Sequence, residues 1–150
     1  MSNAGPAEIL QSFAALVDEA FAAPRGVKPA IAGDPARAVE LLTAGQMGGL
    51  AVVVFYEGDT AAGDDHWDPR VLATVRAVVL RRQGLGAGAR GAEVLELAGE
   101  LRRALSGAGL AGVLGGVAYQ GMAPVQTAEG RMLEGYSLKF GVLYADQVRE

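Results

Sequence analysis

The stretch WDPRVLATVRAVVLRR, residues 67–82, decides the fold, because from residue 71 onward its side chains alternate between two faces. One face carries only small or β-branched apolar side chains: Val71, Ala73, Val75, Ala77 and Val79. The other face is mixed: Leu72, Thr74, Arg76, Val78, Leu80 and Arg82. A period of two is typical of a β-strand. Residues 71–82 would span roughly 40 Å at about 3.3 Å per residue, so we expect this strand to outreach a small sheet and to project toward a partner.

One helix and two further strands are expected after this strand. The helix covers residues 92–105 and ends at residues 106–109 (SGAG). Its apolar stripe has helical spacing and consists of Val94, Ala98, Leu101 and Leu105. Residues 113–125 and 132–145 are predicted to be strands. The second of them alternates, and its core-like face carries Tyr136, Leu138, Phe140, Val142 and Tyr144.

The residues before the long strand predict another strand and a loop. Residues 50–56 (LAVVVFY) are β-branched and aromatic and lack a helical period. This pattern predicts a strand that is buried on both faces. Residues 57–68 (EGDTAAGDDHWD) are polar, acidic and contain glycine, so they are predicted to form an exposed loop.

The N-terminal third of the chain is predicted to be helical. A first helix begins near Pro6 and ends at residues 23–26 (APRG). Its apolar stripe is predicted to be Ile9, Phe13, Leu16 and Ala20. A second, shorter helix is predicted for residues 34–44, with Asp34 as its cap and Gly45 at its end.

Together these elements predict an α+β fold. We expect a mainly antiparallel sheet of about four strands, packed by one long amphipathic helix and by the N-terminal helices. The 150 residues are enough to bury a core, and residues 5–150 are expected to form a single domain. The opening residues 1–4 (MSNA) are interpreted as a cloning remnant.

The composition argues against several classes of function. The net charge of −4 and the isoelectric point near 5.0 disfavour binding to bare nucleic acid, which needs a concentrated positive surface. Cysteine is absent, which excludes disulfides, thiolate metal sites and cysteine nucleophiles. The longest apolar run, residues 50–56, is too short to span a bilayer, and the first residues do not resemble a signal peptide. We therefore expect neither a nucleic-acid nor a membrane partner.

A glycine motif offers one alternative function. Gly86, Gly88 and Gly91 match the spacing G-x-G-x-x-G between a predicted strand and a predicted helix, as in dinucleotide-binding loops. However, 22 glycines make a chance match to this loose pattern easy. The next strand carries Tyr119 and Gln120 where an acidic residue would hold a ribose, and the βαβαβ repeat is missing. A flexible connection is the favoured interpretation, and a small-ligand or nucleotide-binding domain is the alternative.

No catalytic, cofactor or metal site is predicted. His66 is the only histidine, and with Asp64 and Asp68 it would need ligands from another subunit to close a metal site. No serine lies in a G-x-S-x-G motif, and the two lysines belong to no phosphate-binding loop. We therefore expect a protein that is not an enzyme and uses no cofactor. The clustered aspartates and a basic strand end are instead candidates for contacts with a neighbouring subunit; these interface candidates are Asp64, Asp65, Trp67, Asp68, Arg81 and Arg82.

The order of the predicted elements resembles the phage tail-terminator and minor-tail-protein family, especially the group found in Mu-like contractile-tailed phages and prophages. The resemblance covers roughly residues 7–144 and depends on the N-terminal helix and four segments of sequence. These segments are LAVVVFYEGD, WDPRVLATVRAVVLRR, GAEVLELAGELRRALSG and GYSLKFGVLYA.

The resemblance implies a small structural subunit without catalytic residues. Such proteins assemble as a homo-hexameric ring that caps the tail tube and offers a surface for head–tail joining. The implied partners are further copies of the chain, the tail tube protein and a head–tail connector protein, while the isolated subunit can stay monomeric. The implied location is the virion tail, and the host bacterial cytoplasm during assembly. A bacterial protein recruited from a phage gene is a third interpretation.

Overall fold

The computed structural model describes residues 5–25, 31–32, 50–63, 68–82, 90–125 and 133–145. Its helical elements are α1 (Pro6–Val17), the π-helical turn η1 (Asp18–Ala22), the 3₁₀ turn η2 (Ala23–Arg25) and α3 (Arg90–Leu105). Its strands are β1 (Ile31–Ala32), β2 (Leu50–Ala61), β3 (Arg70–Arg82), β4 (Val113–Pro124) and β5 (Leu133–Ala145). Residues 1–4, the predicted second helix at 34–44 and the tip of the predicted loop at 64–67 lie outside the described residues.

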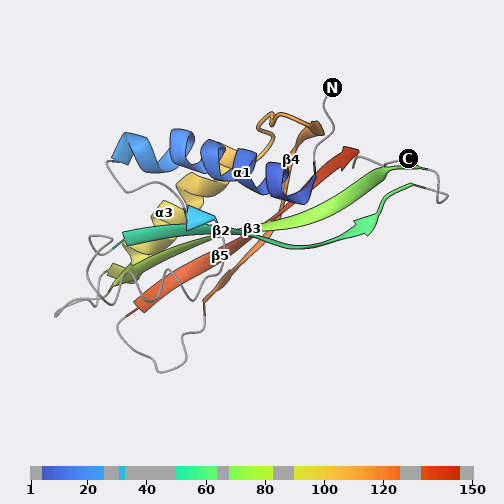
Figure 1. The fold of residues 1–150 in the computed structure, drawn as a ribbon. Helices are drawn as coiled ribbons and strands as arrows, with labels where there is room; N and C mark the ends of the chain where they lie inside the picture. The colour runs from blue at the N-terminus through green and yellow to red at the C-terminus, as the bar shows by residue number, and fades with distance from the viewer. Residues whose placement is uncertain are drawn as a thin grey trace.

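The strands form one sheet in the order β1-β2-β3-β5-β4. β2, β3, β5 and β4 pair antiparallel, and the two-residue strand β1 adds a short parallel pair beside β2. Both long helices, α1 and α3, pack on the same face of this sheet (Figure 1). The predicted α+β fold with a mainly antiparallel sheet of about four strands is thereby confirmed.

The main core lies between the helices and the sheet. The apolar face predicted for the long strand is confirmed, because Ala73, Val75, Ala77 and Val79 are fully buried in this core. The predicted stripe of α3 is confirmed as well, since Val94, Ala98, Leu101 and Leu105 are all buried. β5 contributes Leu138, Phe140, Val142 and Tyr144 to the same core, as its alternation predicted.

A smaller apolar cluster lies on the opposite face of the sheet. It contains Ala51 and Val53 from β2 together with Val78 and Leu80 from β3. Val52 and Val54, which alternate with the first pair, belong to the main core. The prediction that residues 50–56 form a strand buried on both faces is confirmed for residues 51–54, because alternate side chains enter two different clusters.

The buried stripe of the N-terminal helix differs from the predicted one. Ile9 and Phe13 are buried as expected, but Val17 and Phe21 complete the stripe, and Leu16 and Ala20 are only half-buried. The reason is the π-helical turn that follows Val17. A π turn holds more residues than an α turn. Phe21 therefore stays on the core side, four residues after Val17. A continued α-helix would rotate Phe21 away from the core.

The prediction of a loop over residues 57–68 is wrong for its first part. Glu57–Ala61 continue β2, and residues 58–61 pair with residues 71–74 of β3. The ladder extends to a hydrogen bond of 3.0 Å from the Ala62 amide to the Arg70 carbonyl. A bulge between Tyr56 and Gly58 shifts the register there. Polar and acidic residues are tolerated because they are exposed on a strand whose partner supplies the hydrogen bonds.

Gly135 is predicted to be a position where a single methyl group destabilises the sheet. A Cβ at Gly135 would lie 2.2 Å from the carbonyl oxygen of Val79, so the backbones of β5 and β3 would have to separate. Gly135→Ala is expected to lower the free energy of unfolding by about 1–3 kcal/mol. Gly58→Ala is the matched control, because no heavy atom lies within 4 Å of a Cβ there. Denaturant melts of both variants measure the difference; equal melting midpoints would contradict the prediction.

Candidate interaction surface

The sheet face opposite the helices carries a row of three leucines across adjacent strands. Leu72 of β3 pairs in register with Leu143 of β5, and Leu143 pairs with Leu114 of β4. Leu72 is 41% exposed and Leu114 is 48% exposed, while Leu143 between them is half-buried. We call these three residues the leucine row. Leu72 and Leu114 are two of the three exposed large hydrophobic residues in the described part of the chain.

Polar side chains border the leucine row. Thr60 of β2 pairs with Leu72 and continues the same row. The Gln120 side chain lies over Gly141, since a Cβ at Gly141 would come within 2.4 Å of the Gln120 amide nitrogen. The same Cβ would lie 3.7 Å from the Leu72 side chain, so Gln120 lies close to one end of the row. An exposed apolar strip with a polar border is the arrangement that protein-binding surfaces show.

The edge strand β4 is irregular. It forms one end of the sheet, and its pairing with β5 shifts register between Leu114 and Ala118 and again between Tyr119 and Gly121. The segment between α3 and β4 covers part of its outer side, because Val117 exchanges backbone hydrogen bonds of 2.7 and 2.9 Å with Gly107 and Ala108. Bulges and a covering segment limit unspecific strand pairing at a sheet edge. The face of the sheet is therefore a better candidate for a specific contact than its edge.

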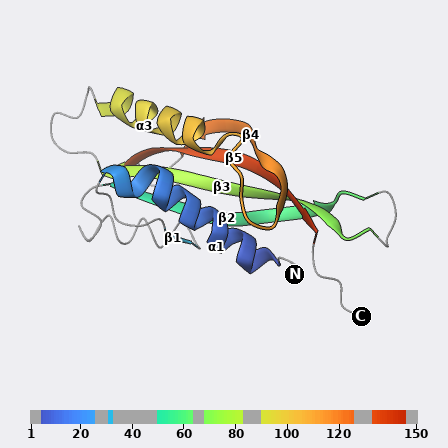
Figure 2. The same ribbon diagram turned by 90° about the horizontal axis from the view of Figure 1, so that it is seen from above.

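The paired ends of β2 and β3 form a hairpin that extends beyond the two helices (Figure 2). The expectation that the long strand outreaches its sheet is wrong, because Arg70–Arg82 pair with β5 over their whole length; whether the hairpin meets a partner stays a prediction. Its bulge is tied to the core by Tyr56, whose hydroxyl donates to the Asp59 carboxylate and lies 2.8 Å from the hydroxyl of the buried Tyr144. Burial, and then the hydrogen bond to Asp59, raise the pKa of Tyr56, so it stays neutral and keeps its hydroxyl hydrogen.

A second polar contact on this hairpin lies on the sheet face opposite α1 and α3. Arg76 of β3 donates from Nε to the Glu57 carboxylate at 2.6 Å and from a terminal nitrogen to the Ser137 hydroxyl at 3.0 Å. The contact joins residues of β2, β3 and β5 beside the bulge. The hairpin is thus held by polar side-chain contacts on both faces of the sheet, which favours a defined orientation over a loose one.

The interface candidates from the sequence are not brought together where they are described. Asp68 precedes the start of β3, whereas Arg81 is half-buried near the other end of this 13-residue strand. Arg82 ends β3, but its side chain lies outside the described residues, as do Asp64, Asp65, His66 and Trp67. Sequence reasoning also missed the leucine row. Its members lie on three predicted strands, and only the pairing register aligns them.

Asp68 binds its near neighbour Arg70. Both carboxylate oxygens accept hydrogen bonds from the guanidinium group, at 2.7 to 3.1 Å, and one also accepts from the Arg70 amide at 3.0 Å. These hydrogen bonds lower the pKa of the Asp68 carboxyl. The acidic residue is therefore partly neutralised within the subunit, which weakens the case for Asp68 as a contact to a basic neighbour.

The Asp68 carboxyl is expected to titrate below the ordinary aspartate range. Its lowered pKa means that the ion pair contributes fully above the ordinary value and is lost as pH falls through the lowered one. The titration of its side-chain carboxyl carbon, followed by nuclear magnetic resonance, measures this directly. In Arg70→Gln the midpoint should move back up toward the ordinary aspartate value; an unchanged midpoint would show that Arg70 does not cause the shift.

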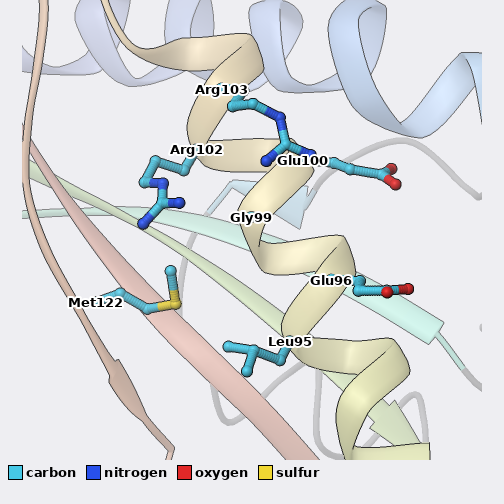
Figure 3. A pocket seen from close by; sticks show the side chains of 7 residues that line it. All are labelled: Leu95, Glu96, Gly99, Glu100, Arg102, Arg103 and Met122. Atoms are coloured by element: carbon cyan, nitrogen blue, oxygen red, sulfur yellow. The ribbon is translucent and has the colours of Figure 1, made fainter.

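A shallow hollow lies between α3 and β4 on the helix side of the sheet. Its lining residues are Leu95, Glu96, Gly99, Glu100, Arg102, Arg103 and Met122. In Figure 3, Leu95, Arg102 and Met122 lie on one side of α3, whereas Glu96 and Glu100 extend from the other. The Arg102 guanidinium lies 5.5 Å from the centre of the Tyr119 ring, a cation–π distance. The hollow thus mixes two acidic and two basic side chains with exposed apolar surface.

The described residues contain no group of three or more histidine, aspartate or glutamate side chains that could hold a metal ion. None of the helices described above is long and apolar enough to cross a membrane. The candidate nucleotide loop lies outside the described residues at Gly86 and Gly88, and Gly91 lies in the first turn of α3.

No model of a known protein family matches the sequence, and no curated protein sequence matches it. A functional hypothesis therefore depends on the surfaces described above and on the resemblance in element order.

Proposed function

We propose that this chain is a structural subunit of a phage or prophage tail that assembles as a ring at the end of the tail tube. The observation that carries the proposal is the leucine row, which is exposed on the sheet face opposite α1 and α3. The order of helices and strands, which resembles tail-terminator proteins, supplies the kind of assembly. In this proposal the chain works by binding neighbours and performs no chemical reaction.

The leucine row suits a contact that forms only on assembly. Burying apolar surface contributes about 25 cal/mol per Å², so three leucines provide a modest gain for each contact. A modest gain per contact is consistent with a subunit that stays monomeric in isolation and joins a ring on the tube, where several contacts form at once.

The projecting hairpin suits a second contact with a different neighbour. A closed ring of identical subunits needs two different surfaces on each subunit, one for each neighbour. The hairpin and the leucine row both involve β3, since Leu72 of the row pairs with Thr60 of β2 beyond the bulge. We propose that this end of the molecule meets the next subunit or the tube. The tail tube protein and a head–tail connector protein are the proposed further partners, and the virion tail is the proposed location.

Deleting the gene from its phage or prophage tests the function. A tail terminator stops tube growth, so we expect tails of uneven and excessive length without it, together with a loss of joined heads. Electron microscopy of the particles measures both, and restoring the gene on a plasmid is the control. Tails of normal length that carry heads in the absence of the protein would overturn the proposal.

A further inference from the structure

We draw no further inference here: the strongest candidate, the hollow between the outer face of α3 and the edge strand β4, combines side chains of both charges with the exposed Leu95, and nothing in the structure shows what covers it.

Discussion

Replacing Leu101 with alanine is expected to lower the free energy of unfolding by about 2–5 kcal/mol. Leu101 is fully buried in the core cluster that α3 shares with α1 and the sheet. Removing three carbon atoms there loses their transfer free energy and leaves a cavity that the surrounding side chains can fill only in part. A single domain of this size has a total stability of roughly 5–15 kcal/mol, so the variant would lose a large fraction of it. Urea melts followed by circular dichroism measure the change.

Glu96→Ala on the same helix is the control for Leu101→Ala. Glu96 is exposed and lies one and a half turns from Leu101, and alanine keeps the helical propensity high. Its effect on the free energy of unfolding should stay within about 0.5 kcal/mol. If the two variants lost similar stability, the face that α3 presents to the sheet would be assigned wrongly.

The parts of the fold that could be predicted are those whose residue pattern is compatible with only one kind of secondary structure. β3 alternates without interruption over residues 71–80, and only a strand places Ala73, Val75 and Ala77 on one face. Likewise, only a helix places the apolar residues of the α3 stripe on one face. In both cases burial of the apolar face and the local backbone preference point to the same structure.

The features that could not be predicted depend on contacts between distant segments. Residues 57–61 (EGDTA) are mostly small or polar and loop-like by composition, yet β3 pairs with residues 58–61 and holds this segment in the sheet. The place of Phe21 depends on a π turn, for which the sequence around Asp18 carries no clear signal. The leucine row needs the register of three strands from two separate pairings, and strand register is a property of the assembled sheet.

Replacing Leu114 with lysine is expected to abolish assembly while leaving the fold intact. Leu114 is 48% exposed and lies at the β4 end of the leucine row, so a lysine there can extend into solvent in the free subunit. In a contact that covers the row, the ammonium group would lose its water without gaining a partner, a cost that exceeds the modest gain from three leucines. We expect the variant gene to fail to restore normal tail length in the deletion phage.

Leu95→Lys is the matched control, because it makes the same change at a leucine that is 47% exposed on the outer side of α3. The Leu95→Lys gene should restore normal tails. The free energies of unfolding of Leu114→Lys and Leu95→Lys should both lie within about 0.5 kcal/mol of that of the unaltered protein. Leu72→Lys, at the other end of the row, repeats the test on a different strand and guards against a local effect on β4. Loss of function in Leu114→Lys and Leu72→Lys but not in Leu95→Lys would locate the contact on the sheet face opposite α1 and α3. Normal tails from both Leu114→Lys and Leu72→Lys would exclude the leucine row from the assembly contact. This conclusion would hold whatever the result of deleting the gene. The deletion tests the role in the tail, and the lysine variants test the surface that performs it.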